Sequence, residues 1–329
     1  MLAALLLLLV SVLGSSPAPA VSRTMLEVSQ LKRPQPKLTT ETSVRPKAIQ
    51  QKRPQPKSII ETSVRPKVSE SDQPAPTEPI GEIDSGHSQA ILAWNVESGG
   101  NDPRTIAKQL KQLYGYDVYC LCEVRPDSLP LYASAFGEDF HAVESSSGGG
   151  DRQLILIDRR KFKLIKHFEV HKLNRGNHRA PLLVFLQDLE TGKHLAIIAN
   201  HLARGDKKLR QKQAAGLREL VRGLDVGMVA IGDFNMDFSF RRMQGNPAFT
   251  EMVRDNIWKW VAPEPLVDTQ WSDNNGKDRY PNSMLDFAFV AGPAKDWQPK
   301  CRVIVRLGDF PDNSSTSDHR PVELRLKLK

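Results

Sequence analysis

The apolar positions of this sequence are grouped in short runs that alternate with polar segments from Gln89 to the C-terminus. Runs of about four to eight apolar or alternating residues are typical of β-strands that are buried on one or both faces. Most of the aromatic residues also fall in this part of the chain. The pattern predicts strands at residues 90–94, 116–122, 153–157, 181–186, 195–199, 228–231, 284–290, 302–305 and 322–328.

Three segments have the spacing of amphipathic helices. In the first, Asp102 and Pro103 supply an N-cap and a first-turn proline, which favour the start of a helix. The second carries a basic outer face, and the third opens at Asn246-Pro247. Their expected inner residues are Ile106, Leu110 and Leu113; Leu209, Leu217, Leu220 and Val221; and Phe249, Met252, Val253 and Ile257.

Many strands, few helices and much loop predict an α/β fold in which stacked sheets are flanked by helices. Residues 87–329 are long enough to form one domain with a sizeable core. The composition changes sharply before this segment, so the whole length of 329 residues overestimates the folded part.

The N-terminal residues 1–20 resemble a secretory signal peptide. Residues 1–13 are almost wholly apolar, and Ala18-Pro19-Ala20 supplies small residues for cleavage, although no lysine or arginine precedes the run. A membrane-spanning helix would need about 20 apolar residues, and this run is too short. We therefore expect a secreted or periplasmic protein without a stable membrane span.

Residues 21–86 contain a duplicated basic, proline-rich unit. The segment KRPQPK at 32–37 recurs at 52–57, and ETSVRPK at 41–47 recurs at 61–67. Such repeats cannot bury a core, so they predict a disordered or polyproline-like tether. Its charge suits contact with nucleic acid or an anionic envelope, but a solvated linker is the interpretation we favour, because such tails are common.

The formal net charge of +8 indicates an anionic partner without identifying it. Three cysteines are too few for a disulfide scaffold. Cys120 and Cys122 lie on one face of a predicted strand, where small core residues are expected, and no His or Cys at ligand spacing predicts a zinc site. Cys301 is free, or pairs if the compartment is oxidising. Neither charge nor cysteine content defines an oligomeric state.

Polar residues follow several of the predicted strands. Asn95 and Glu123 each end a strand and are separated by a single helix. If the two strands are neighbours, both side chains reach one sheet edge. Carboxylate and amide oxygens suit Mg²⁺ or Mn²⁺, which keep several waters and take up substrate phosphate. Individually, a turn residue at Asn95 and a surface acid at Glu123 remain the simpler interpretations.

The segment Gly232-Asp233-Phe234-Asn235 follows another apolar run. Glycine allows the backbone and a substrate to approach closely, and alternation points Asp233 and Asn235 the same way. An acid can hold an attacking water and an amide can bind a phosphoryl oxygen. An Asx-type turn is the alternative interpretation.

Two histidines, His201 and His319, also lie at strand ends. A lone histidine is more often structural than catalytic. Two histidines with acids nearby are different, because an acid on one ring nitrogen fixes the tautomer and raises the basicity of the other. We therefore expect these strand ends to converge on one phosphate and one hard metal ion.

Six segments together resemble the endonuclease/exonuclease/phosphatase superfamily over essentially residues 89–329: ILAWNVE, YCLCEV, NHLARG, AIGDFNMD, SMLDFAFV and TSDHRPV. The resemblance implies a four-layer α/β sandwich, with two central sheets and helices outside, and metal-assisted hydrolysis of phosphate esters. By position, it also implies that Asn95 and Glu123 form the metal-site pair, with Asp318 as a further acid near the metal.

The same resemblance implies roles for the remaining polar residues. Asp233 and Asn235 match the residues that place the nucleophile and bind the phosphate. His319 matches the catalytic histidine, which the acid at Asp286 orients rather than the neighbouring Asp318. These assignments follow from the motifs and not from spacing.

Within the superfamily, the sequence is more similar to the pancreatic-type deoxyribonucleases, which complete their site with a second acid–histidine pair and an arginine. Asp151 is similar in placement to that second acid, with His201 as its partner. Arg179 resembles the phosphate-clamping arginine. In the abasic-site enzymes a tyrosine occupies the latter region, and this sequence has none there.

We therefore expect a secreted, divalent-metal-dependent phosphodiesterase that acts as an endonuclease on nucleic acid. A lipid phosphodiesterase or sugar-phosphate phosphatase, sphingomyelinase- or inositol-phosphatase-like, is the first alternative. A non-catalytic protein that binds nucleic acid or an envelope is the second. The basic residues 207–212 favour nucleic acid but also suit a solvated helix face. Trp258, Trp260 and Trp271 would stack bases or touch lipid, although helical spacing makes core packing as good an interpretation of the first two.

Overall fold

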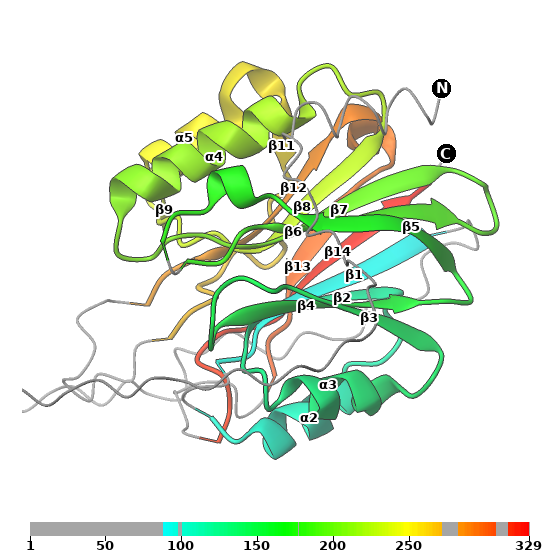
Figure 1. Ribbon diagram of the computed structural model, residues 1–329. Coiled ribbons are helices and arrows are strands. Elements are labelled where there is room, and N and C mark those ends of the chain that lie inside the picture. The colour runs from blue at the N-terminus through cyan, green and yellow to red at the C-terminus, as the bar shows by residue number, and fades with distance from the viewer. Residues whose placement is uncertain (1–87, 98–100, 177, 272–281, 307–314, 329) are drawn as a thin grey trace, which may run out of the picture. The chain divides into compact units, whose positions relative to one another are not determined.

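The computed structural model describes residues 88–97, 101–176, 178–271, 282–306 and 315–328. The predicted signal peptide (1–20) and tether (21–86) lie outside these residues. Within them, two six-stranded sheets pack face to face and helices cover their outer faces (Figure 1). The predicted four-layer α/β sandwich is confirmed. None of the helices in the described part of the chain has the length and apolar character that a bilayer crossing requires.

The strands of the first sheet, in spatial order, are β13 (Lys300–Val303), β14 (Val322–Lys327), β1 (Ser88–Asn95), β2 (Val118–Val124), β4 (Arg152–Asp158) and β3 (Phe140–Glu144). Those of the second sheet are β11 (Trp258–Trp260), β12 (Asp286–Ala291), β8 (Gly227–Asp233), β7 (His194–His201), β6 (Leu182–Asp188) and β5 (Phe162–Glu169). A small ribbon pairs β9 (Phe238–Ser239) with β10 (Gln244–Gly245).

The two sheets share one pattern of strand direction. In each, the two central strands are parallel, β1 with β2 and β7 with β8. Every other pairing within the six-stranded sheets of the described chain is antiparallel. Parallel neighbours end at the same sheet edge, which is where open α/β sheets bind ligands.

The helices lie on opposite sides of the sheet pair. The first sheet is covered by α2 (Pro103–Gln112), α3 (Leu129–Ala133) and the short 3₁₀ helix η2 (Ser134–Phe136). The second is covered by α4 (Lys207–Val221) and α5 (Pro247–Val253) (Figure 1). Further 3₁₀ turns are η3 (His171–Leu173), η4 (Arg254–Asn256) and η5 (Gly292–Asp296).

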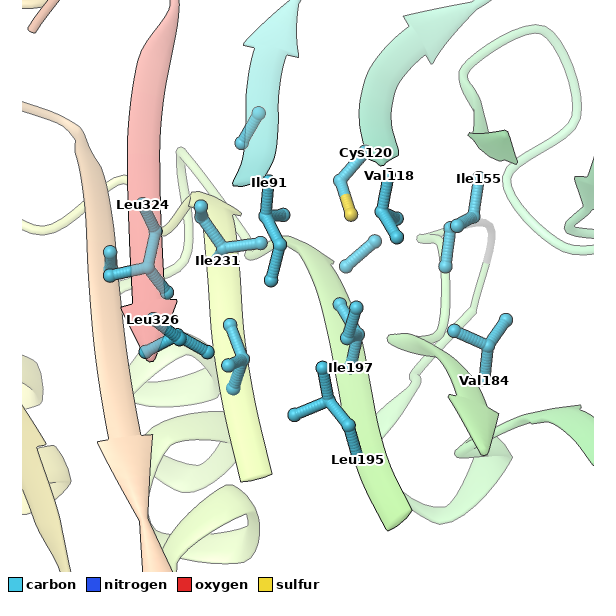
Figure 2. Packing of buried hydrophobic residues seen from close by; sticks show 14 of the residues in the cluster. Ile91, Val118, Cys120, Ile155, Val184, Leu195, Ile197, Ile231, Leu324 and Leu326 are labelled. Atoms are coloured by element: carbon cyan, nitrogen blue, oxygen red, sulfur yellow. The ribbon is translucent and has the colours of Figure 1, made fainter. Parts of the chain in front are cut away.

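Alternation along each strand sorts its side chains between two cores. In β1, Ile91 and Ala93 enter the core between the sheets, whereas Leu92 and Trp94 pack against α2 and α3. Figure 2 shows the inter-sheet core, where side chains such as Ile91 of the first sheet face Ile231 of the second. Burial of these apolar side chains on both faces of each sheet fixes the strand register.

The third predicted helix is wrong beyond Val253, and with it the helical placement of Trp258 and Trp260. Asp255 (φ 58°) and Asn256 (φ 51°) adopt left-handed backbone, which ends the helix. Ile257 therefore lies outside α5 and the two tryptophans lie in strand β11. Trp258 is nevertheless fully buried, and its Nε1 donates to the Leu217 carbonyl at 3.1 Å, so this side chain belongs to the core.

Strands β3, β5 and β11 were not predicted, and all three lie at sheet edges. An edge strand that is half exposed needs fewer apolar residues, so its sequence signal is weak.

One residue of the predicted basic helix face is placed differently from the prediction. Arg210 is buried at 4% exposure, and its Nη1 donates to the carbonyls of Ala203 and Arg204.

The three cysteines are buried and unpaired. Cys120 and Cys301 lie in the inter-sheet core, so the disulfide alternative for Cys301 is wrong. Burial raises the pKa of all three thiols. Each is therefore a neutral core residue, as expected for Cys120 and Cys122.

Candidate active site

The carboxyl ends of the two parallel strand pairs form one site between the sheets. Asn95 and Glu123 come from the ends of β1 and β2, and His201 and Asp233 from the ends of β7 and β8. Asn95 Nδ2 lies 3.1 Å from Asp233 Oδ2, and His201 Nε2 lies 3.5 Å from Glu123 Oε1. The two sheets therefore contribute to a single cluster of polar side chains.

His319 and Asp286 form a buried acid–histidine pair in this cluster. Asp286 begins β12 and lies opposite Asp233 in the antiparallel register with β8. His319 Nδ1 lies 2.8 Å from Asp286 Oδ2, while its Nε2 lies 4.0 Å from Asp233 Oδ2 and 3.8 Å from Asp318 Oδ1. Asp286 thus orients the ring, and the other nitrogen faces the remaining acids.

Neighbouring charges and burial shift the pKa values of His319 and Asp286 in opposite directions. Burial lowers the pKa of His319, but the carboxylates of Asp286, Asp318 and Asp233 outweigh it and raise the pKa well above its ordinary value. Burial also raises the pKa of the Asp286 carboxyl, which the contact with His319 only partly offsets. The carboxylates therefore favour the charged form of His319, and burial favours the neutral form of Asp286.

A second acid–histidine pair approaches the same oxygen, Asp233 Oδ2. His201 Nδ1 lies 3.2 Å from Asp151 Oδ1, and its Nε2 lies 3.4 Å from Asp233 Oδ2. Arg179 joins the pair, because its Nη1 lies 2.5 Å from Asp151 Oδ2 and its Nε donates to the His201 carbonyl at 3.0 Å. The structure thus brings together the three residues that the resemblance grouped.

The Asp151 carboxylate is held ionised by these neighbours. Burial raises its pKa, but the hydrogen bond and charge of His201 and the charge of Arg179 outweigh burial and lower the pKa below its ordinary value. Because two Arg179 nitrogens are engaged, that side chain orients the acid–histidine pair as well as supplying positive charge.

The loop before Asp151 is anchored by one carboxylate. Glu169 accepts hydrogen bonds from the backbone N–H groups of Ser146 (2.9 Å) and Ser147 (3.0 Å), and from both serine hydroxyls. Gly148 has φ 93°, and a Cβ there would lie 2.2 Å from the Asp151 carbonyl oxygen and 3.0 Å from Arg179 Cβ. Only glycine fits that turn, so this loop fixes where Asp151 and Arg179 meet.

The end of β8 is equally restricted. Gly232 has φ 127°, and a Cβ there would lie 2.4 Å from the Asn200 carbonyl oxygen of β7. Two residues after Asp233, Asn235 adopts φ 49°, and its backbone N–H donates to Asp233 Oδ1 at 2.8 Å. The Asn235 amide donates to the Leu202 carbonyl at 3.0 Å. The Asx-type turn, which was the alternative interpretation of this segment, is therefore present. Asp233 and Asn235 also belong to the polar cluster.

Asn95 is oriented differently from the arrangement expected of a metal ligand. Its amide nitrogen donates to Glu123 Oε1 at 2.9 Å and to Asp233 Oδ2 at 3.1 Å. Its oxygen accepts from the Glu97 backbone N–H at 3.0 Å. A flip of the amide would leave that N–H without this acceptor, so Asn95 holds two carboxylates in place.

Two residues near Asp318 were not singled out from the sequence. Glu97 has φ 44°, and its Oε2 accepts from the Asp318 backbone N–H at 2.9 Å. Gln270, buried at 2% exposure, donates from Nε2 to Asp318 Oδ2 at 3.1 Å. Glu97 lies two residues after Asn95 in one motif, which is a signal that could have found it; nothing in the local pattern marks Gln270.

Other side chains fix the backbone of the site. Trp94 Nε1 donates to the His319 carbonyl at 2.8 Å, and the Ser317 hydroxyl donates to the Asn95 carbonyl at 2.6 Å. The Thr269 hydroxyl accepts from the N–H groups of Leu285 and Asp286 at 2.9 and 3.0 Å. The first two bonds join the end of β1 to the segment before β14, and the Thr269 bonds fix the start of β12. Together they restrict the movement of His319 and Asp286.

The donor set suits a hard cation. One group of three residues has ligand atoms within 4.8 Å of one another: Glu123, Asp151 and His201. The Asp151 carboxylate in that group already contacts Arg179. Elsewhere in the site, the Glu97 carboxylate accepts from the Asp318 backbone N–H. Carboxylate oxygens are the ligands that Mg²⁺ and Mn²⁺ prefer.

All ten residues predicted for the site belong to one continuous network of contacts, none of them longer than 4.0 Å. They are Asn95, Glu123, Asp151, Arg179, His201, Asp233, Asn235, Asp286, Asp318 and His319. The ends of β1, β2, β4 and β14 in one sheet and of β7, β8 and β12 in the other supply or flank them, so the site exists only when both sheets are formed.

Comparisons with known proteins identify the same architecture. The sequence model described as Endonuclease/Exonuclease/phosphatase family matches residues 92–319. No protein with a curated description matches the sequence. Solved structures do match it. Their sequence identities to this chain are low, so the matches show a shared fold and nothing more.

Three of these structures illustrate the range. An endonuclease/exonuclease/phosphatase family protein from Bacteroides thetaiotaomicron has a TM-score of 0.54 at 15% identity, covering 75% of this chain and 100% of the other. A mannosyl-6-phosphatase of the same organism has a TM-score of 0.51 at 16% identity, with coverages of 72% and 98%. D. rerio TDP2 complexed with single strand DNA product has a TM-score of 0.57 at 17% identity, with coverages of 74% and 100%.

Proposed function

Since this chain belongs to the endonuclease/exonuclease/phosphatase family and is therefore a phosphoester hydrolase, we propose that it is a divalent-metal-dependent phosphodiesterase whose substrate is nucleic acid. One observation supports the mechanism above all. Two histidines, each bonded through Nδ1 to its own acid, direct their Nε2 atoms toward Asp233 Oδ2 from 3.4 and 4.0 Å. Two acid–base groups beside one carboxylate suit a hydrolysis in which one group takes a proton from water and the other gives a proton to the leaving oxygen.

Glu123 and Asp318, with Asn95 holding the former, are the residues that would hold the cation. Asn95 Nδ2 bonds the carboxylates of Glu123 and Asp233, and Glu97 accepts from the Asp318 backbone N–H. A divalent cation would neutralise the negative charge that these acids gather here. When bound, Mg²⁺ or Mn²⁺ stabilises charge on the phosphate oxygens in the transition state.

The side chains then divide the proton transfers among themselves. Asp233 holds a water, whose oxygen forms a bond to phosphorus opposite the leaving oxygen, and the P–O ester bond breaks. One histidine, His319 or His201, takes the proton from the water, and the other gives its proton to the leaving oxygen. Asn235 and Arg179 would hold the non-bridging oxygens, where charge stabilisation contributes most to rate.

Nucleic acid is supported by charge. Residues 21–86 contain 11 of the 46 basic and 8 of the 38 acidic residues, so residues 87–329 retain a net charge of +5 by themselves. Phosphate contacts dominate the affinity of nucleic-acid-binding proteins. One similar structure was solved with a single strand DNA product and another is a mannosyl-6-phosphatase. A sugar-phosphate phosphatase or lipid phosphodiesterase is therefore the second candidate.

The location of the protein is part of the proposal. The apolar run at residues 1–13 followed by Ala18-Pro19-Ala20 supports export to the periplasm or the medium. Mass spectrometry of the exported protein should find an N-terminus close to residue 21. Export with cleavage would be contradicted if the exported protein still began at Met1. It would also be contradicted if the protein were found in the cytoplasmic fraction alone.

The function is tested with plasmid DNA, single-stranded oligonucleotide and RNA in Mg²⁺ or Mn²⁺, with and without EDTA. We expect cleavage that EDTA stops. His319→Ala and Asp233→Asn should each lower the rate by about a hundredfold or more, on the order found for transition-state groups, with unchanged circular dichroism. Unchanged activity in either variant removes the mechanism. DNA binding without cleavage supports the non-catalytic alternative, and release of inorganic phosphate or phosphocholine supports the second candidate.

A further inference from the structure

The first turns of α4 are surrounded by concave, basic surface. One hollow of about 230 Å³ is lined by Arg204, Lys207 and the site residue Asn235. A second, of about 320 Å³, is lined by Lys172, Arg175, Lys208 and Lys212. A third hollow, of about 160 Å³, shares Lys207 with the first hollow and Lys208 with the second. We call these hollows together the α4 basic groove.

The charge of the groove is strongly positive. Its exposed basic residues are Lys172, Arg175, Arg204, Lys207, Lys208 and Lys212. The acids among its lining residues are Asp206 and Asp237. The Asp206 side chain caps α4 by accepting from the Leu209 N–H at 2.9 Å, so its position is set by the helix. The balance favours a polyanion over a neutral or cationic partner.

The groove is continuous with the active site. Asn235 lines its first hollow and is bonded through its backbone N–H to Asp233. The Asn235 amide also bonds the Leu202 carbonyl, and the buried Arg210 bonds the carbonyls of Ala203 and Arg204. The loop that presents Arg204 is therefore held at one end by the active site and at the other by α4.

The lining residues offer contacts to phosphates and not to bases. Among the described residues that line the three hollows, none is aromatic. Base stacking on aromatic rings supplies much of the affinity of sequence-tolerant single-strand binders, and this described lining offers none of it. Lysine and arginine contacts to phosphate position a strand without reading its sequence.

We propose that the α4 basic groove binds the backbone phosphates of a polynucleotide on one side of the scissile phosphate. The enzyme would then act on polymer in preference to small phosphodiesters, without base specificity from this surface and with strong dependence on salt. This inference rests on the proposed nuclease function. It goes beyond that function because it locates the path of the strand over α4, and because it predicts substrate length as a determinant of rate.

The test uses the full chain and the variant Lys208→Ser/Lys212→Ser, whose two positions line the second and third hollows and not the first. Binding of a fluorescent oligonucleotide of about 20 nucleotides, longer than one typical single-strand site, is measured by anisotropy in EDTA, where cleavage does not interfere. We expect the double variant to bind about tenfold more weakly or worse. The slope of log affinity against log salt should become shallower by about 0.7 for each phosphate that the variant no longer neutralises.

The matched control is Lys108→Ser/Lys111→Ser, which removes the same charge from exposed positions on α2, beyond the other sheet (Figure 1). It should bind DNA like the unmodified protein. The basic tether is present in all three proteins, so differences between them report the groove alone. Hydrolysis of bis(p-nitrophenyl) phosphate by the control variant should equal that of the unmodified protein.

The outcomes separate the two proposals. If the double variant binds DNA with unchanged affinity and salt dependence, the groove proposal is overturned even when the protein is a nuclease. If instead the variant loses affinity only for phosphatidylserine vesicles, the groove serves a lipid surface and the proposal is equally overturned. If DNA binding falls as expected while no form cleaves any diester, the groove proposal stands as a binding surface and the nuclease function fails.

Discussion

His201 and Asp233 lie opposite each other on the parallel central strands β7 and β8, and His201 Nε2 is 3.4 Å from Asp233 Oδ2. Both side chains are buried, at 4% and 2% exposure. His319 Nε2 lies 4.0 Å from the same oxygen, and Asp286 holds that ring through Nδ1. Two oriented histidines beside one carboxylate supply one group to take a proton and one to give a proton.

The two histidines should be distinguishable by leaving group. His201→Ala and His319→Ala should each lower DNA cleavage by about a hundredfold or more. An activated ester such as bis(p-nitrophenyl) phosphate needs no proton on its leaving oxygen. One of the two variants should therefore recover most of its rate on that ester, while the other does not. Recovery of both, or of neither, would show that the histidines do not divide the roles of base and acid.

The position of the cation is decided by comparing three substitutions in a calorimetric titration with Mg²⁺ or Mn²⁺. Glu123→Gln should weaken binding by at least about tenfold, the scale found for altered metal sites. Asp318→Asn should do the same, because we propose that these two acids would hold the cation. Asp151→Asn should leave the affinity nearly unchanged, since Arg179 already balances that carboxylate. The reverse order would assign the cation to Glu123, Asp151 and His201.

The stability that the loop before Asp151 gives to the fold should depend on pH, because Glu169 holds that loop. Burial raises the pKa of this carboxyl, but hydrogen bonds from Ser146 and Ser147 outweigh burial and lower it. A pKa that is lower in the folded state stabilises the fold above the unfolded value of about 4.3, and this stabilisation is lost as the pH falls through the folded pKa.

Glu169→Gln should therefore reduce the free energy of unfolding by about 1–3 kcal/mol at neutral pH, with a difference from the unmodified protein that shrinks below about pH 4.3. Chemical denaturation at several pH values measures it. Glu144→Gln, at a side chain 57% exposed, is the matched control and should change little. A Glu169 effect that is independent of pH would mean that the hydrogen bonds from the two serines do not require the ionised carboxylate.

Gly232 should tolerate no side chain. Its φ of 127° and the 2.4 Å approach of a Cβ to the Asn200 carbonyl oxygen both exclude alanine. Gly232→Ala should lower the free energy of unfolding by about 2 kcal/mol or more. Gly150→Ala, where a Cβ meets nothing within 4 Å, should stay within about 0.5 kcal/mol. Equal thermal unfolding of the two variants would contradict the strained contact between β7 and β8.

The hydrophobic pattern predicted most of the strands because buried strands need apolar residues on both faces. It missed β3, β5 and β11, since edge strands bury less and so need fewer such residues. It also extended α5 too far, because nothing in the apolar spacing reveals that Asp255 and Asn256 turn left-handed. Local patterns record burial, and they do not record where the backbone changes direction.

By itself, the sequence determined which residues end the strands, and its resemblance to one superfamily pointed to the ten residues of the site. Only the tertiary structure decided how those residues face one another. Asn95 turns its nitrogen toward Glu123, Arg179 contacts Asp151, and Glu97 and Gln270 hold Asp318. The physical reason is that hydrogen bonds between distant segments depend on how two separately patterned sheets pack together, and apolar alternation carries no information about that packing across the site.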